Sequence, residues 1–207
     1  MSQFDLIYAD SDILVVNKAP GLLSVPGRGP DKQDCLIHRV QAVYPDALAV
    51  HRLDMATSGL LLLARGAPMH RQLSMLFQER QVAKRYIAVV AGQLATETGE
   101  INLPLICDWP NRPRQMVSFE IGKPSLTRYR LISFDSLSNS SRVALEPITG
   151  RSHQLRVHMA ALGHPILGDD LYGSASSAPR LLLHATMLSF PLPGSDQWQR
   201  FESPPDF

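Results

Sequence analysis

The sequence has few cysteines and no long apolar segment. Among its 207 residues only Cys35 and Cys107 are cysteines, and they are far apart in the chain. Two thiols cannot supply a Cys-based zinc site or a disulfide scaffold, so we expect a reducing, cytoplasmic compartment. No run reaches the roughly 18 apolar residues that a membrane helix requires. Residues 1–12 contain three aspartates and no basic group, unlike a secretory signal or transit peptide.

Short motifs for several common chemistries are also absent. There is no Gly-x4-Gly-Lys-Ser/Thr phosphate loop, no Gly-x-Gly-x-x-Gly and no Gly-x-Ser-x-Gly nucleophile motif. His153 and His158 are five residues apart, which is about 140° around a helix, so they do not share a face. This spacing argues against a His-x3-His zinc site. We therefore expect neither a metal nor a nucleotide cofactor.

The formal net charge is only +1 and by itself says nothing about nucleic acid. The distribution says more. Five basic residues and one acidic residue lie between Arg65 and Tyr86, and five basic and two acidic residues lie between Asp108 and Arg130. Such stretches can hold a polyanion on one face without a high overall pI. They are also typical of an ordinary solvated surface, and both interpretations remain open.

Apolar, β-branched runs predict strands at 6–8, 13–16, 60–64, 86–90, 127–134, 142–145 and 181–190. Helical spacing predicts helices over 34–44, 68–80 and 152–162, with Asp34 as a cap of the first and Gly163 ending the last. Strands dominate without a βαβ rhythm, so we expect an α+β fold with a mostly antiparallel sheet. No linker divides the chain, and we expect one domain over residues 1–207.

The segment from His51 to Gly59 is polar and leads into the predicted buried strand. Asp54 therefore lies on a loop beside a rigid element, which is where proteins commonly place catalytic groups. Arg52, two residues earlier, supplies a hydrogen-bond donor nearby. The alternative is a purely structural ion pair between Arg52 and Asp54.

A second polar segment runs from Gly150 to Met159 and contains Arg151, His153 and Arg156. Its alternative interpretation is a polar helix start that Ser152 or a neighbouring group caps.

Five ordered segments together resemble the RluA-type family of pseudouridine synthases over nearly the whole chain. They are Tyr8–Leu22, His51–Gly59, Lys84–Tyr86, Gly150–His158 and Gly163–Asp169. The resemblance implies the pseudouridine synthase fold, a mostly antiparallel mixed β-sheet with flanking helices and a central RNA-binding cleft. It implies a single catalytic domain without the N-terminal S4 domain that many relatives carry.

Two further segments narrow the resemblance. Ser24–Arg28 and Leu103–Pro113 are most similar to family members that modify both tRNA and 23S rRNA. This similarity implies that the substrates are uridines in a tRNA anticodon stem-loop and in a 23S rRNA hairpin. Such a reaction requires no cofactor, and nothing in the sequence predicts more than a monomer.

The resemblance also implies roles for single residues. Asp54 corresponds to the catalytic aspartate, Arg156 to its positive partner and Tyr86 to an aromatic that packs on the target base. Arg52 corresponds to the group that fills the gap left by the flipped base. Whether Asp54 adds to the base, adds to the sugar or removes a proton stays open. Without the resemblance, the preferred interpretation of Tyr86 is an ordinary strand aromatic.

The basic stretches become candidates for contacts with RNA phosphates. The predicted RNA-binding residues are Arg52, Arg65, Arg85, Arg112, Arg114, Arg151 and His153. Asn17 and Lys18 match a family motif for which we expect a structural role.

Two other function classes stay as alternatives. One is a non-catalytic RNA-binding protein that keeps only the RNA-binding surface. The other is a glycoside or nucleoside hydrolase using Asp54, although most such enzymes need a second carboxylate that no motif here supplies.

Overall fold

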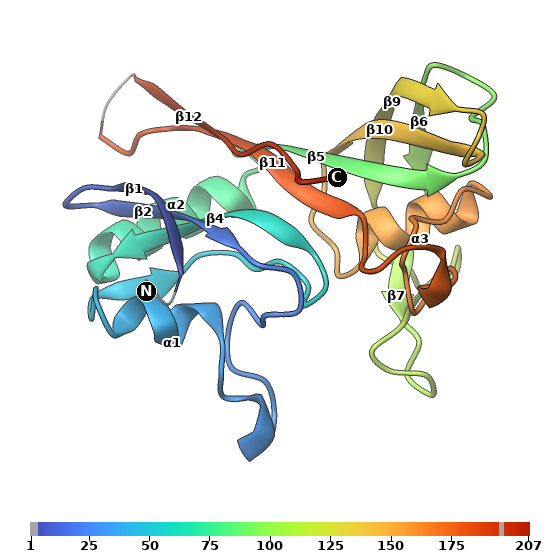
Figure 1. Ribbon diagram of the computed structural model, residues 1–207. Coiled ribbons are helices and arrows are strands. Elements are labelled where there is room, and N and C mark those ends of the chain that lie inside the picture. Colours follow the sequence, from blue (N-terminus) through green and yellow to red (C-terminus); the bar gives the residue numbers. More distant parts are fainter. Residues whose placement is uncertain (1–3, 195–196) are drawn as a thin grey trace. The chain divides into compact units, whose positions relative to one another are not determined.

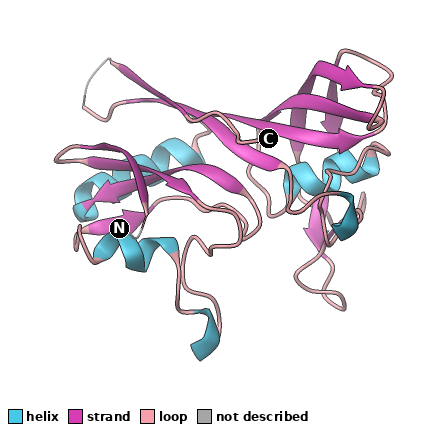
Figure 2. Cartoon of the chain, viewed as in Figure 1, coloured by secondary structure: helices cyan, strands magenta, loops and turns pink. Residues whose placement is uncertain are grey.

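Apolar, β-branched runs form most of the strands in the computed structural model, which describes residues 4–194 and 197–207 (Figure 2). The chain divides into two compact units. The first unit runs up to Lys84 and resumes from His184 to Asp206. The second runs from Arg85 to Leu183 and includes Phe207. The unit boundaries therefore fall inside two strands, β5 (Ala83–Ala91) and β11 (Leu183–Pro191).

The first unit has a mixed sheet in the order β1-β2-β4-β11, with β12 paired to β11 and β3 paired to β4 (Figure 1). Its other strands are β1 (Asp5–Ala9), β2 (Ile13–Lys18), β3 (Ala47–Ala49), β4 (Ser58–Arg65) and β12 (Trp198–Glu202). The β4–β11 pair is parallel and the other pairs are antiparallel. The predicted strands at 6–8 and 13–16 are confirmed as the antiparallel pair β1–β2, and so is the mostly antiparallel character of the fold.

The core of this unit forms where β4 meets helix α2 (Gly66–Gln78). Leu60 and Leu62 of β4 and Leu73 of α2 are fully buried in one cluster with residues of β2 and β11. A fully buried leucine side chain contributes about 1.5–3 kcal/mol. The cluster therefore makes β4 a rigid strand, and the loop containing Asp54 leads directly into it.

The second unit has an antiparallel sheet in the order β5-β10-β9-β6 and a separate β7–β8 pair. Its strands besides β5 are β6 (Thr98–Asn102), β7 (Leu105–Cys107), β8 (Gln115–Val117), β9 (Leu126–Asp135) and β10 (Ser140–Pro147). Helix α3 (Gln154–Ala161) is anchored at its start by the buried side-chain amide of Gln154. That amide donates to the Leu126 carbonyl and accepts from the Thr149 hydroxyl and the Arg151 N–H. The expected cap by Ser152 or a neighbouring side chain is wrong: His153 precedes the helix and forms no capping side-chain hydrogen bond.

The predicted cap at Asp34 is wrong. Helix α1 covers only Leu36–Gln41, and Cys35 precedes it without a capping side-chain hydrogen bond. The Asp34 carboxylate instead accepts two hydrogen bonds from Arg39 (2.8 and 2.7 Å), because an arginine one turn into the helix is a stronger partner than a backbone N–H.

The short 3-10 helices η1 (Pro30–Lys32) and η2 (Ala175–Ser177) complete the helical elements. None of the helices in residues 4–194 and 197–207 is long and apolar enough to cross a membrane.

Gly59 allows the close approach of β4 to β11. Its φ is +113°, and a Cβ at this position would lie 2.4 Å from the carbonyl oxygen of Ala185. Any side chain would therefore push the parallel strand away. Gly59 is paired in register with Lys18 of β2, so this tight packing lies next to the Asp54 loop.

Candidate active site

The loop containing Asp54 is held on both sides. The Ser24 hydroxyl donates to the Leu53 carbonyl (2.8 Å) and accepts from the Leu53 N–H (3.0 Å). On the other side, the Met55 carbonyl accepts from the Gly21 N–H at 2.9 Å. Asp54 itself is half-buried. These bonds fix the backbone around the carboxylate without using the carboxylate itself.

Lys18 places a buried positive charge beside this loop. Its side chain is fully buried, and its ammonium donates to the carbonyls of Ala19, Leu22 and Met55 at 2.7–2.9 Å. Burial lowers the pKa of Lys18 to about 8, and the negative charge of Asp54 partly opposes that decrease. The ammonium is thus still protonated at neutral pH. Lys18 both anchors the loop and acts electrostatically on Asp54, which exceeds the purely structural role expected from its motif.

Arg52 is exposed, and within the described part of the chain it forms no ion pair. The alternative of a structural Arg52–Asp54 pair is therefore wrong. Its predicted role in RNA binding stays a prediction.

His51, at the start of the same loop, is neutral and structural. Its Nε2 accepts the Leu62 N–H at 2.9 Å, and its ring stacks on Phe77 with centroids 4.5 Å apart. Burial and, to a lesser extent, the charge of Lys84 lower the pKa of His51 to about 3. The imidazole therefore holds the loop against β4 and α2 and takes no part in proton transfer near neutral pH.

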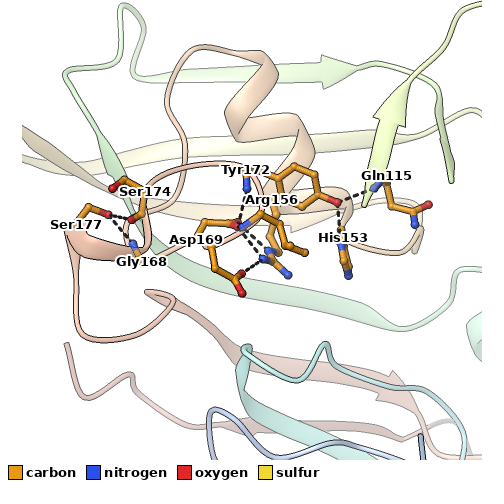
Figure 3. A network of polar contacts seen from close by, with 10 residues as sticks. Gln115, His153, Arg156, Gly168, Asp169, Tyr172, Ser174 and Ser177 are labelled. Carbon is orange, nitrogen blue, oxygen red and sulfur yellow. Dashed lines mark hydrogen bonds and ion pairs between the residues drawn. The ribbon is translucent and has the colours of Figure 1, made fainter. Parts of the chain in front are cut away.

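Arg156 lies buried on α3 and forms a bidentate pair with Asp169. Its Nε and Nη2 donate to the two Asp169 oxygens at 2.8 and 2.7 Å (Figure 3). Nη2 also donates to the Asp170 carboxylate at 3.0 Å. Burial raises the pKa of Asp169, but the hydrogen bonds and charge of Arg156, with the N–H groups of Leu171 and Tyr172, outweigh burial and lower that pKa. The pairing of Arg156 with Asp54 that the family resemblance implies stays a prediction.

Tyr172 connects Arg156 with the start of α3. Its hydroxyl accepts the Gln115 N–H and bonds His153 Nδ1, each at 2.7 Å (Figure 3). The guanidinium groups of Arg156 and Arg114 lie 5.3 and 5.5 Å from its ring centroid. His153 has a left-handed backbone, with φ of +53°, which is uncommon outside glycine. The network fixes the orientation of the predicted RNA-contacting His153.

Tyr86 is half-buried on β5, where it pairs in register with Leu145 of β10. It belongs to the second unit with Arg156, whereas Asp54 belongs to the first unit.

The predicted RNA-binding arginines fall into two groups. Arg65 and Arg85 are ion-paired with Asp46 and Glu146, respectively. Arg112, Arg114 and Arg151 form no ion pair with any residue that the structure describes; Arg112 and Arg114 lie over aromatic rings and Arg151 contacts the Pro124 carbonyl. The positive charges of Arg112, Arg114 and Arg151 are not balanced by a carboxylate in the described part of the chain, so they are better suited to bind an RNA phosphate.

Sequence reasoning assigned no role to Asp169 or Tyr172. Asp169 lay within a family segment, and its position after Gly168 was the only signal. Tyr172 carried none, because its side-chain contacts are with residues 16 to 58 positions earlier in the chain. Among residues 4–194 and 197–207, no three His, Cys, Asp or Glu side chains form a group that could hold a metal ion.

The family described as RNA pseudouridylate synthase matches residues 12–161. The dual-specificity RNA pseudouridine synthase RluA of Escherichia coli strain K12 is 51% identical over 205 residues, covering 98% of this chain and 93% of that relative. The RluA protein of Salmonella typhi is 52% identical with the same coverage. The solved structure of human RNA Pseudouridylate Synthase Domain Containing 1 has a TM-score of 0.83 and 30% identity, covering 100% of this chain and 85% of that one.

Proposed function

This chain belongs to the RNA pseudouridylate synthase family and is an RNA pseudouridine synthase, and we propose that it modifies uridines in a tRNA anticodon stem-loop and a 23S rRNA hairpin. The relatives named dual-specificity, at 51–52% identity over nearly the full chain, support two RNA substrates. The similarity of segments Ser24–Arg28 and Leu103–Pro113 to such members supports these two RNA classes.

The reaction is an isomerisation. The N1–C1′ bond of uridine breaks, the base turns, and a C5–C1′ bond forms. C5 loses a proton and N1 gains one, so neither oxidation nor net hydrolysis occurs. This balance is consistent with a chain that needs no cofactor, and it requires one ionised carboxylate and a group that handles the C5 proton.

We assign the carboxylate to Asp54, and one observation carries this assignment. The loop around Asp54 is fixed by Ser24, Gly21 and Lys18, while the carboxylate is left half-buried beside a buried ammonium. A fixed positive charge stabilises an ionised carboxylate, and a fixed loop avoids reorganisation during the reaction. Asp54 then acts as nucleophile or base on the target nucleotide.

We assign the remaining chemistry by the family motifs. A uridine in a folded RNA must leave its stack to react, which costs a few kcal/mol. Arg52, exposed and without an ion pair in the described chain, is suited to fill the resulting gap. Tyr86 supplies a ring for the target base and Arg156 a positive partner for the reaction, and we expect the two units to act as one catalytic domain.

Phosphate contacts are proposed for the basic residues, and the two groups differ. Arg112, Arg114 and Arg151 are expected to contribute more than Arg65 and Arg85, whose charges are already compensated. Each lost phosphate contact should reduce the salt dependence of RNA binding. We also propose that the protein acts as a monomer in the cytoplasm, where Cys35 and Cys107 stay reduced; both are free thiols.

The test uses RNA tritiated at uridine C5, with no cofactor added. Release of tritium from anticodon stem-loop and 23S hairpin transcripts is the expected result, and mapping of the modified positions identifies the target uridines. Absence of release from both RNAs would overturn the proposal. Salt-dependent binding without release would favour the non-catalytic alternative, and free uracil as product would favour the hydrolase.

A further inference from the structure

The turn between β7 and β8 carries an exposed tryptophan partly covered by an arginine. Trp109 is 65% exposed, and the Arg112 guanidinium lies 4.6 Å from its ring centroid. Phe119 and Ile121, just after β8, are 78% and 67% exposed. Large exposed apolar groups gathered in one segment are typical of an interaction surface. In Figure 1 the yellow-green loop after β7 extends away from the strands.

The turn has a defined shape. The Asp108 N–H donates to the Arg114 carbonyl (3.0 Å), the Asn111 N–H to Asp108 (3.1 Å) and the Arg114 N–H to Asn111 (3.1 Å). The Asn111 amide also donates to the Asp108 carboxylate. Trp109 and Arg112 are therefore presented by a fixed backbone, and a ligand that binds them orders little of the chain.

The same turn is connected to the network around α3. The Gln115 N–H, one residue after Arg114, donates to the Tyr172 hydroxyl, which also bonds His153. The Arg114 guanidinium lies over the Tyr172 ring on which Arg156 also lies. The turn that carries Trp109 is thus connected through Tyr172 to Arg156 and to His153, a predicted RNA-binding residue.

Charge favours a nucleic acid over an apolar protein partner. Neither Arg112 nor Arg114 forms an ion pair within the described chain, and the hydrogen bonds of Asn111 engage the nearby Asp108 carboxylate. An arginine stacked on an aromatic ring still directs its N–H groups outward in its own plane. An aromatic face beside uncompensated guanidiniums matches a nucleobase next to its phosphate.

We propose that Trp109 and Arg112 form a second RNA contact, in which an unpaired nucleobase of the substrate loop stacks on Trp109 while Arg112 contacts an adjacent phosphate. The inference rests on the proposed function, because it presupposes a stem-loop substrate. No bond is made or broken at this contact. Its effect is to select RNAs that have an unpaired base in addition to the reactive uridine.

Fluorescence gives a direct test, because the chain has only two tryptophans, Trp109 and Trp198. Trp198 lies on β12 of the first unit and is 62% exposed. The variant Trp198→Phe leaves Trp109 as the sole fluorescent tryptophan. The matched control Trp109→Phe leaves only Trp198. The RNA is a stem-loop that the protein modifies, at saturating concentration. A second RNA keeps the loop backbone but lacks its bases outside the target uridine.

Stacking predicts that the intact loop quenches Trp109 and that the abasic loop leaves its fluorescence nearly unchanged, whereas Trp198 responds to neither RNA. Equal quenching by both RNAs, or none by the intact loop, would overturn the inference. So would concentration-dependent dimerisation in sedimentation that Trp109→Ala abolishes, since the patch would then bind a second copy.

Kinetics separate this inference from the proposed function. Trp109→Ala should raise KM for the stem-loop by about 10- to 100-fold with little change in kcat, as expected for one lost base stack. Trp109→Phe should retain most of the affinity, and Trp198→Ala should behave as wild type. An unchanged KM in Trp109→Ala, with tritium still released, defeats only this inference. Absence of release from any RNA by wild type defeats the proposed function.

Discussion

Lys18 in the first unit and Arg156 in the second are both buried cations, and the protein stabilises them in opposite ways. Three neutral carbonyl oxygens surround the Lys18 ammonium, and its pKa falls to about 8. Arg156 forms a bidentate pair with the buried Asp169 and a further contact with Asp170. The hydrogen-bond partners of Lys18 are thus neutral, whereas Arg156 has two carboxylates beside it.

This difference separates two uses of a buried charge. The charge of Lys18 acts on Asp54, because no other carboxylate is among the described contacts of Lys18. Arg156 contributes chiefly a rigid, planar set of donors, because Asp169 compensates much of its charge. Removal of a partner should therefore affect mainly activity in the first region and mainly stability in the second.

The largest expected effect is loss of activity in Asp54→Asn. The amide keeps the size of the side chain but cannot act as nucleophile or base, so tritium release should fall by about 1,000-fold or more. RNA affinity and the melting temperature should stay close to wild type. Asp12→Asn, which changes an exposed carboxylate in the same unit, is the control. Activity within tenfold of wild type would remove Asp54 from the reaction.

Asp169→Asn should produce the largest loss of stability. It leaves the Arg156 guanidinium buried without its main compensating charge, which costs about 3–5 kcal/mol. Urea unfolding measures the change. Asp170→Asn, in which the lost carboxylate is 67% exposed, should cost no more than about 1 kcal/mol. Equal losses in the two variants would show that the Arg156–Asp169 pair is not the dominant contact.

Acid should destabilise the protein through His51. The folded-state pKa is about 3 and the unfolded value is 6.5, so the unfolded chain binds the proton first as pH falls. The full stability is present above about pH 6.5 and decreases below it by up to about 1.4 kcal/mol per pH unit. His51→Gln should reduce that slope in urea unfolding between pH 6.5 and 4. A slope equal to wild type in this variant would contradict the assignment.

Lys18→Met should change stability at neutral pH only modestly, because two opposing effects partly cancel. It leaves three carbonyls without their donor, at about 1–3 kcal/mol, but also removes a buried charge. The dependence of stability on pH above about 8 distinguishes the two proteins more clearly. The Lys18 pKa is about 8 when folded and 10.5 when unfolded, so wild-type stability should rise relative to the variant between these values. Parallel curves for the two proteins from pH 8 to 10 would exclude the lowered pKa.

Much of the fold could be predicted from local pattern. The apolar run from Leu60 to Ala64 predicted a buried strand, and β4 (Ser58–Arg65) contains it, because a continuous apolar run must be covered on both faces. The spacing of Met69, Leu73 and Phe77 predicted α2, because residues four apart lie on one face of a helix. The prediction of Asp34 as a helix cap failed, because Arg39 competes with the backbone N–H groups for the Asp34 carboxylate.

The candidate site divides in the same way. The motif around Asp54 was visible in the sequence, because a polar loop before a buried strand is a local feature. The contacts of Lys18 with Met55 and of Arg156 with Tyr172 join residues 37 and 16 positions apart, and no periodicity connects them.

The sequence by itself determined the longer strands, the two principal helices and the family, since these follow from side-chain pattern and ordered motifs. It also supplied the residues that we propose carry the chemistry. Only the tertiary structure decided which charges stay uncompensated. Lys18 is surrounded by carbonyls, Arg156 and Arg65 have carboxylate partners, and Arg112 lies on Trp109. The physical reason is that electrostatic compensation depends on distance in space and on burial, and neither is encoded in the spacing of residues along the chain.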